Sequence, residues 1–340
     1  MTGISIPFGS PLKKVEQQDR SPKKVFILGG CANAVHAKWI DAEGNVNVEA
    51  LPVVCEPSIF WEGENAEQIV QSIQLPPKLG KLLPADKKDN WDYKMSMRFE
   101  LLRPLGIQRE EAWFCYLMPY PRLTQEKFQT IEDNYNPLAA TYNLPESVLP
   151  IFNPSELSNP SRLGEILVEL KQSQADTIVL LGDLPVEHFL SHFSKYKKLS
   201  DFEEGLDDFG KLINYGKKHK VEIDGKLYNV IPLIGLKHFG KSENPTFRQY
   251  HRYWIGKGVI YNSLKKITGR DPSLVAKMPK KCPICHEKEI ATCVYENPPL
   301  SESLQEKIKN GEIVLRDTPM TKDDPAYMCR ECGFEFYMSL

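Results

Sequence analysis

Two pairs of cysteines, each with the spacing CxxC, are the residues whose types and spacing most directly indicate chemistry. The pairs are Cys282 with Cys285 and Cys329 with Cys332. Thiolates two residues apart can bind one tetrahedral metal ion, and a second pair completes a four-cysteine zinc site. The pairs are farther apart than the ~15–20 residues typical of such patterns, so we expect an inserted strand or loop between them.

A disulfide pairing is the alternative for these cysteines, but the composition is that of an intracellular chain, where disulfides are rare. We therefore predict a structural Zn2+ ion, because a closed set of four thiolates has no open position for catalysis. The module around the ion would be a zinc ribbon that helps to bind nucleic acid or a partner. His286 and Cys293 are the substitute ligands, and both are weaker candidates than the four cysteines.

The elements that must position any other functional residue follow from hydrophobic periodicity. Short apolar runs predict buried strands at residues 25–28, 48–54, 112–117, 177–183 and 228–234. Helices are predicted from near Ala34 and at residues 68–73, 96–102, 125–135, 160–173 and 185–193. A further helix from Phe247 is expected to be interrupted at Gly256 and Gly258 before a last helical piece to Lys266. Strands alternating with helices predict an α/β fold, namely three αβα layers with a mostly parallel central sheet.

Local signals support parts of this arrangement. Asn159 is a preferred N-cap residue, and Pro160 then occupies the first helical position. Asp224 and Gly225 favour a type I′ hairpin turn. In open α/β sheets ligands bind beyond the carboxyl ends of the strands. The predicted binding edge therefore lies at Leu28, Val54, Leu117, Leu181 and Ile234.

Length and composition set the domain organisation. The 340 residues, 41% of them hydrophobic, suffice for one large domain with an appendage or for two domains. We predict a flexible segment at residues 1–23, an α/β domain at 24–267, and a linker with a zinc ribbon at 268–340. The start lacks an apolar signal segment, and no run approaches the ~20 apolar residues of a membrane span. We therefore expect a soluble, cytoplasmic protein without a membrane partner.

The charge distribution bears on the class of partner. A net charge of −2 and a pI of about 6.4 count against indiscriminate coating of nucleic acid. Lysines and arginines nevertheless recur between residues 195 and 281. This pattern indicates either a basic face or a solvated surface.

Five segments, in this order, resemble the uracil-DNA glycosylase superfamily, and within it the bacterial uracil-DNA-glycosylase-like proteins. They are ILGGCANAVHAKW, ALPVVCEPSIFWEG, LLRPLGIQREEAWFCYLMPYPR, RLGEILVELKQSQADTIVLLGD, and VIPLIGLKHFG followed by YHRYW. They span residues 24–254. The resemblance implies a parallel sheet whose strand ends form a pocket for a base flipped out of DNA. It also implies a motif after the first strand that places a water for attack on the sugar, and a motif after the last strand that stabilises the departing base.

Both motifs depart from the pattern of the family. At the positions of the family's acid or amide, this chain has Gly30 and Cys31, and the nearest amide is Asn33. In the second motif, Gly235 and Leu236 stand where the family has histidine and proline. Three alternatives follow: a different base with different catalytic groups, a slow enzyme, or a fold retained for binding.

The candidate catalytic residues are Asn33, Glu56, His36 and His238. Asn33 either orients the water or caps the helix expected near Ala34. Glu56 follows an apolar strand and either activates the water or lies in a surface turn. His36 either contacts a phosphate or the leaving base, or is structural. His238 lies in the loop after the last strand, a position suited to holding phosphate or entering the duplex.

Residue type and position suggest further candidates for a base pocket and for DNA contacts. The pocket residues are Gly29, Gly30, Cys31, Phe60, Trp61 and Tyr116. Aromatic stacking on a flipped base would contribute roughly 1–3 kcal/mol, although adjacent aromatic residues more often pack in a core. Tyr116 lies where the family reads the base edge. The predicted DNA-binding residues are Lys237 and Lys241 in the loop after the last strand, and Arg248 and Arg252 on the following helix, whose aromatic residues would more often pack in a core.

The resulting hypothesis is a DNA glycosylase that hydrolyses the N-glycosidic bond of a flipped, damaged or modified base and leaves an abasic site. The resemblance adds a role in antiviral defence, through removal of hypermodified bases from phage DNA. The alternative is a catalytically degenerate nucleic-acid-binding protein of the same fold. A nucleotide-dependent Rossmann enzyme is disfavoured, because Gly29 and Gly30 are not followed by a GxGxxG pattern or a P-loop lysine.

Overall fold

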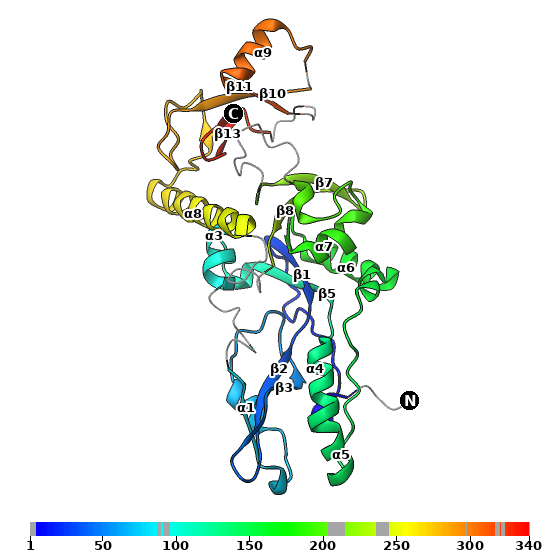
Figure 1. Ribbon diagram of the computed structural model, residues 1–340. Coiled ribbons are helices and arrows are strands. Elements are labelled where there is room, and N and C mark those ends of the chain that lie inside the picture. The colour runs from blue at the N-terminus through cyan, green and yellow to red at the C-terminus, as the bar shows by residue number, and fades with distance from the viewer. Residues whose placement is uncertain are drawn as a thin grey trace.

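The computed structural model describes residues 5–86, 90, 96–202, 215–235, 245–296, 298–316, 320 and 324–339. Within these ranges the strands form three sheets, which follow one another along an elongated molecule (Figure 1). The central sheet lies between a small antiparallel sheet and the sheet of a C-terminal module.

The central sheet carries the predicted parallel strands. In spatial order it consists of β5 Ala112–Met118, β1 Val25–Cys31, β6 Thr177–Leu181, β8 Lys226–Leu233 and β7 His219–Ile223. The first four strands are parallel, and β7 pairs antiparallel with β8. The turn between them has φ of 50° at Asp224 and 77° at Gly225, as a type I′ hairpin requires. The predicted α/β fold with a mostly parallel central sheet is confirmed.

The two faces of this sheet are covered differently. Phe26 and Leu28 face α6 Pro160–Ser173 and α7 Asp183–His188, because successive side chains of a strand alternate between faces. Val25 and Ile27 face the small sheet, the π-helical segment η4 Ser96–Leu102 and α8 Pro245–Thr268. The expected third layer is therefore part sheet and part helix.

The small sheet corrects two predictions. Its strands are β3 Val46–Cys55, β2 Ala34–Ile40 and β4 Lys81–Pro84. The helix expected from near Ala34 is wrong, because these residues form β2, which is hydrogen-bonded to a strand on each side. The strand predicted at 48–54 exists as β3, but in this sheet, so Val54 does not lie at the edge of the central sheet. Val35 and Trp39 are fully buried in this pairing, and packing of this kind decides strand preference.

Helix α6 begins and ends where the sequence indicates. The side chain of Asn159 accepts a hydrogen bond from the backbone amide of Ser161 at 2.9 Å, and the helix ends at Ser173. The helix predicted at 125–135 is divided into α4 Gln125–Thr130 and a π-helical segment, η6 Ile131–Tyr135.

The remaining helical segments are short. They are α1 Ala66–Gln71, α3 Arg103–Leu105, α5 Asn136–Tyr142, and the 3-10 turns η1 Pro7–Gly9, η2 Pro77–Leu79, η5 Arg109–Glu111, η7 Pro154–Ser158, η8 Leu190–His192 and η9 Leu199–Phe202.

Residues 5–23, which were expected to be flexible, lie against the central domain. Ile6 and Val15 are 0% and 5% exposed. The amide of Val15 donates to the carbonyl of Pro119 at 2.8 Å, and the side-chain oxygen of Gln17 accepts from the amide of Phe114 at 3.1 Å. The segment therefore uses hydrogen-bonding groups of the edge strand β5, which would otherwise be open to pairing with another chain.

The C-terminal module is built around a five-stranded sheet. In spatial order its strands are β11 Ile313–Arg316, β10 Ile290–Tyr295, β12 Tyr327–Cys329, β13 Glu335–Met338 and β9 Leu274–Val275. Helix α9 Glu302–Lys309 connects the parallel strands β10 and β11, and this unit is the insertion expected between the two cysteine pairs. Strand β9 lies within the segment expected to be a linker, so that segment belongs in part to the module.

Helix α8 joins the central domain to the C-terminal module (Figure 1). The interruption predicted at Gly256 and Gly258 is wrong, because α8 is continuous through both glycines. Trp254 packs against the core of the central domain, and Leu264 packs against the cysteine cluster. Nζ of Lys257 donates to the carbonyl of Cys332 at 2.7 Å, which fixes the module to the helix. None of the helices in the described ranges combines the length and apolar character needed to cross a membrane.

Candidate functional site

The four cysteines of the two CxxC pairs come together in the C-terminal module. Their sulfur atoms all lie within 4.8 Å of one another. Sγ of Cys282 is 3.6 Å from that of Cys332, and Sγ of Cys285 is 3.5 Å from that of Cys329. Four sulfurs bound at ~2.3 Å to one tetrahedral ion would be about 3.8 Å apart. The cluster therefore has the dimensions of a metal site, and the four thiols could bind a metal ion.

Each cysteine pair lies in a tight turn. The amide of His286 donates to the carbonyl of Cys282 at 3.0 Å, and the amide of Gly333 donates to that of Cys329 at 2.8 Å. The residues that close the turns, His286 and Gly333, both have φ of 67°, a conformation that glycine adopts without strain. His286 is exposed and Cys293 lies in β10, and neither belongs to the cluster.

The carboxyl ends of the parallel strands form a second candidate site. The strand order reverses between β1 and β6, because the chain continues from β1 to β5 on one side and from β6 to β8 on the other. Ligands of open α/β sheets bind at such a point. A Cβ on Gly30 would lie 3.1 Å from Cδ1 of Leu184, and the amide of Gly182 donates to the carbonyl of Leu233 at 2.7 Å. The segments after β1, β6 and β8 therefore approach one another closely.

Tyr215 and His251 fix the chain where it leaves β8. The hydroxyl of Tyr215 accepts from the amide of Ile234 at 3.0 Å and lies 2.9 Å from Nδ1 of His251. Nε2 of His251 donates to the carbonyl of Glu100 at 3.0 Å, so Nδ1 accepts from Tyr215. Burial lowers the pKa of His251 to about 3, which keeps the ring neutral and this tautomer in place.

Asn33 and Glu56 meet just beyond the end of β1. The amide of Asn33 donates to Oε1 of Glu56 at 2.8 Å, and the amide of Glu56 donates to the carbonyl of Asn33 at 3.2 Å. Glu56 is only 4% exposed, and its Oε2 accepts from the amide of Trp61 at 3.4 Å. The carboxylate therefore orders the backbone around Asn33. The side chain of Asn33 is half-buried and has no hydrogen bond to another residue in the described part of the chain.

Phe60 occupies a strained position beside this pair. Its φ is 51°, and its amide donates to the hydroxyl of Tyr116 at 2.9 Å. Its ring packs edge-on against Tyr116, with 4.8 Å between centroids, and a Cβ on Gly29 would lie 2.6 Å from Cζ of Phe60. Phe60 and Trp61 are 5% and 4% exposed, so both rings are packed within the core in this structure.

Arg109 holds the other side of the Phe60 turn. Its NH2 group donates to the carbonyls of Ile59 at 2.6 Å and Phe60 at 3.2 Å, and its NH1 group lies 3.2 Å from a carboxylate oxygen of Glu62. The guanidinium lies over the ring of Phe114, 4.7 Å from its centroid. A backbone in a sparsely populated conformation, such as that of Phe60, persists only when several surrounding contacts hold it in place.

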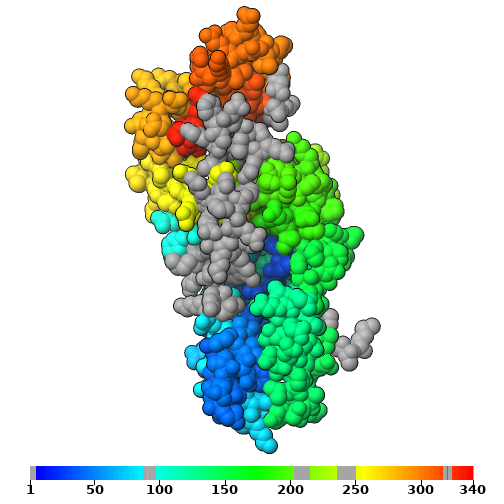
Figure 2. Space-filling view, in the orientation of Figure 1, coloured from blue at the N-terminus to red at the C-terminus, as the bar shows by residue number. Residues whose placement is uncertain are grey.

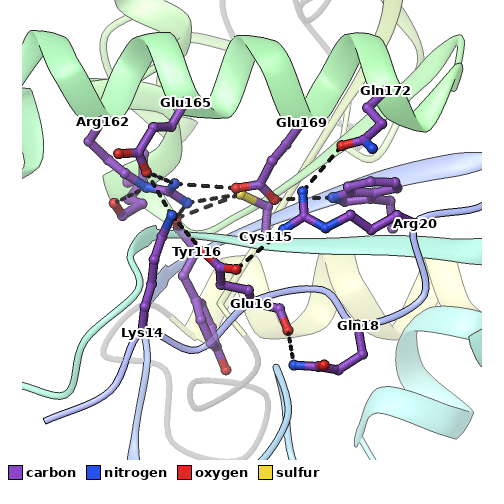
Figure 3. Close-up of polar contacts among 12 residues, drawn as sticks. Lys14, Glu16, Gln18, Arg20, Cys115, Tyr116, Arg162, Glu165, Glu169 and Gln172 are labelled. Atoms are coloured by element: carbon purple, nitrogen blue, oxygen red, sulfur yellow. Dashed lines mark hydrogen bonds and ion pairs between the residues drawn. The ribbon is translucent and has the colours of Figure 1, made fainter.

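Arg162 of α6 fixes the end of β5 from the opposite face of the sheet (Figure 3). Its NH2 group donates to the carbonyl of Tyr116 at 2.6 Å and lies 3.2 Å from Sγ of Cys115. Glu165 and Glu169 balance its charge at 2.8 and 3.3 Å. Burial raises the pKa of the Cys115 thiol, so this cysteine does not supply a thiolate nucleophile.

No family model matches this chain, and no curated protein matches it. Function is therefore inferred from the residues that the fold brings together. Besides the four cysteines, the structure groups Asn33 with Glu56 at the end of β1, and Gly29, Phe60 and Tyr116 beside them. Gly30 and Cys31 end the same strand.

The other predicted site residues lie elsewhere. His36 is on β2 rather than on the first turn of a helix, and its Nε2 is 2.7 Å from Nζ of Lys127 in α4. Arg252 is exposed on α8. Arg248 lies in a part of α8 whose side chains are not described. Three predicted residues fall outside the described ranges, namely Lys237, His238 and Lys241.

Arg109 and Arg162 position the site, and neither was predicted from the sequence. Arg162 had a usable signal, because Glu165 and Glu169 lie on the same face of one helix. Arg109 had none, since the carbonyls that it binds are 49 and 50 residues earlier in the chain.

Proposed function

We propose that this chain is a DNA glycosylase of the uracil-DNA glycosylase superfamily. It would hydrolyse the N-glycosidic bond of a flipped, damaged or modified base and leave an abasic site. The observation that carries this proposal is the pair formed by Asn33 and Glu56 beyond the end of β1. A buried carboxylate there fixes the backbone of a residue that lies at the edge where ligands of such sheets bind.

In the proposed reaction, the side-chain oxygen of Asn33 accepts a hydrogen bond from a water molecule and directs the water oxygen at C1′ of the sugar. A C–O bond forms as the C–N glycosidic bond breaks, and the departing base takes the electron pair. The proton lost by the water neutralises the base anion. Catalysis of this kind depends on positioning and on stabilising the separated charges.

Glu56 would act through Asn33, because its oxygens already accept two backbone hydrogen bonds. We assign the stabilisation of the departing base to His238, which lies outside the described residues and two positions after Leu236, because Gly235 stands where the family has its histidine. Gly30 and Cys31 stand where the family has an acid or amide, which supports a damaged or modified base as the substrate. Removal of hypermodified bases from phage DNA, as an antiviral defence in the cytoplasm, is the role that we propose.

We further propose that the metal bound by the four cysteines is Zn2+ and that the module is a zinc ribbon. Four thiolates in two tight turns suit Zn2+, which prefers tetrahedral sulfur ligands in structural sites. Because the set is closed, the ion would stabilise the module and leave the reaction to the central domain.

A nucleic-acid-binding protein that has lost catalysis is the second candidate. The engagement of Glu56 by the backbone amides of Asn33 and Trp61 favours it, because these hydrogen bonds give the carboxylate a structural role. A dinucleotide-binding enzyme is disfavoured further, since it needs a helix N-terminus directly after the first strand. Here β1 continues into β2 after only two intervening residues, Ala32 and Asn33.

The deciding experiment measures abasic sites. The purified full-length protein is incubated with duplexes that carry normal, deaminated or phage-type hypermodified bases, and the abasic product is quantified by alkaline cleavage. Product from at least one modified duplex is expected. If none forms at high enzyme concentration and long times, while the duplexes still bind, the second candidate is correct.

A further inference from the structure

A basic surface lies at the junction of α8 and the C-terminal module. Residues 265–288 contain seven lysines and arginines but two acidic residues, although the net charge of the whole chain is −2. Within the described structure, Lys265 has a carboxylate partner, Asp271 at 3.6 Å. The other six cations are exposed and have no ion pair with a described carboxylate, namely Lys266, Arg270, Lys277, Lys280, Lys281 and Lys288.

An open groove of about 510 Å³ lies within this surface. Leu264 and Thr268 of α8 form one wall, Leu274 and Pro283 contribute apolar surface, and Arg270 lines it as well. Lys281 is exposed two residues before Pro283. Figure 2 shows the yellow to orange residues of this region gathered on one flank of the molecule. The lining of the groove thus has one cation, Arg270, and one carboxylate, Asp271, which already pairs with Lys265, and the other cations are exposed on the chain segments around it.

We propose that this surface binds the phosphate backbone of DNA outside the base pocket. The proposal rests on the proposed function and adds to it a second DNA contact. Cations concentrated on an otherwise acidic protein attract a polyanion, and binding gains free energy from the counterions that the polyanion releases. A concave groove suits a rod-shaped polyanion better than a flat lipid surface, which favours DNA over a membrane.

Helix α8 connects the carboxyl edge of the central sheet to this surface. His251 is joined through Tyr215 to Ile234 at the carboxyl edge of the central sheet. From His251 to Thr268, α8 is continuous, and at 1.5 Å per residue this part of the helix is about 26 Å long. If the duplex runs parallel to α8, this length corresponds to about eight base pairs at 3.4 Å per base pair, and the second contact would lie on one side of the flipped base.

The test compares two double variants of the full-length protein. Arg270→Glu/Lys281→Glu reverses two cations at the groove, while Lys78→Glu/Lys81→Glu reverses two exposed lysines beside β4, at the opposite end of the molecule. Fluorescence anisotropy measures affinity for a duplex of about 30 base pairs, with a central tetrahydrofuran site as product analogue, over a range of salt concentrations. Unchanged metal content and melting temperature show that both variants are folded.

The groove variant should bind about tenfold or more weakly, and its log–log salt slope should fall by about 1.8, because two phosphate contacts are lost. The lysine variant at β4 should match the wild type. The difference in affinity between the groove variant and the wild type should vanish when the duplex is shortened to about four base pairs on one side of the analogue. It should persist when the duplex is shortened on the other side instead.

Equal affinities of the two variants for the duplex would overturn the inference. So would a groove variant that binds DNA normally but loses binding to vesicles of phosphatidylserine and phosphatidylcholine, which would assign the surface to a membrane. The proposed function is tested by a different measurement and fails if no abasic product forms, so the two failures can be told apart.

Discussion

The carboxylate of Glu56 accepts a hydrogen bond from the backbone amide of Asn33 at 2.8 Å, and Glu56 is 4% exposed. This hydrogen bond assigns different roles to two residues that, from the sequence, are both candidates for positioning the water. Glu56 is buried and engaged by the backbone, whereas the side chain of Asn33 lies half-buried at the edge of the sheet. Their substitutions should therefore have different consequences.

Asn33→Ala should lower the rate of abasic-site formation by about 100-fold or more, because no side-chain oxygen would then direct the water at the sugar. Its melting temperature should stay close to that of the wild type. Glu56→Gln should instead destabilise the protein by about 1–3 kcal/mol, since its amide group would face backbone N–H groups. Single-turnover kinetics and urea unfolding separate the two effects. The assignment is wrong if Glu56→Gln abolishes turnover at unchanged stability.

Gly29→Ala should destabilise the protein, because the added Cβ would lie 2.6 Å from Cζ of Phe60. Overpacking of this kind costs about 1–3 kcal/mol. A second substitution, Phe60→Leu, should recover part of the loss by removing the ring. Gly164→Ala is the control, since a Cβ there meets nothing within 4 Å and alanine favours the helix. Urea unfolding of the single and double variants tests the contact, and additive losses in the double variant would refute it.

The purified protein should contain one zinc ion per chain, measured by atomic emission. Cys282→Ser should lower that content and the melting temperature together, because a structural zinc site contributes folding free energy. Cys293→Ser is the matched control, since Cys293 is a buried cysteine outside the cluster. A different metal in the protein as isolated, or full zinc content in Cys282→Ser, would contradict the assignment.

Glu335→Gln should weaken the attachment of the C-terminal module. Oε1 of Glu335 lies 2.9 Å from Nζ of Lys217 in the central domain and 2.7 Å from NH2 of Arg316. Removing one partner from a fully buried ion pair costs about 3–5 kcal/mol, and the loss here should be smaller because the side chains of Lys217 and Glu335 are 13% and 20% exposed. Glu306→Gln, on the exposed face of α9, is the control and should have no measurable effect on urea unfolding.

The ion pairs of Glu335 with Lys217 and Arg316 also predict that stability depends on pH. Burial alone would raise the pKa of Glu335, but the charges of Lys217 and Arg316 hold it below 4.5. The stabilisation is therefore complete above pH 4.5 and is lost as the pH falls through the lowered pKa of the folded state. Stability of the wild type should decline over this range more steeply than that of Glu335→Gln. If the stability of the wild type and of Glu335→Gln declined equally as the pH fell, the carboxylate would not be held by these cations.

His251 predicts a second loss of stability in acid. Burial lowers its pKa from 6.5 to about 3 in the folded protein, so the unfolded chain binds the proton more readily. Stability should be complete above pH 6.5 and fall toward pH 3, by up to ~1.4 kcal/mol per unit. His251→Gln, which does not titrate, should lack this limb. A His251 ring that titrates near 6.5 by NMR would contradict the buried network.

Several local features could be predicted because their causes lie within a few residues. The N-cap Asn159 started α6, and Asp224 with Gly225 made the β7–β8 turn. The alternation of apolar runs with helices indicated the α/β class. The CxxC spacing indicated a cluster of four cysteines, since each pair closes its own turn.

The arrangement of the site depended on contacts between distant segments. Residues from Ala34 onward form a strand rather than a helix because β3 and β4 pair with them and bury Val35 and Trp39. That pairing also removes β3 from the central sheet and brings Glu56 to Asn33. No local pattern contains this information.

The sequence by itself determined the element types with strong local signals and the identity of the four candidate metal ligands. The tertiary structure alone decided that Glu56 is a buried support for Asn33, and that Arg109 and Arg162 hold the chain around Phe60 and Tyr116. The physical reason is that capping, turns and ligand spacing act over a few bonds. Burial and strand pairing are set by segments that meet only after the chain has folded.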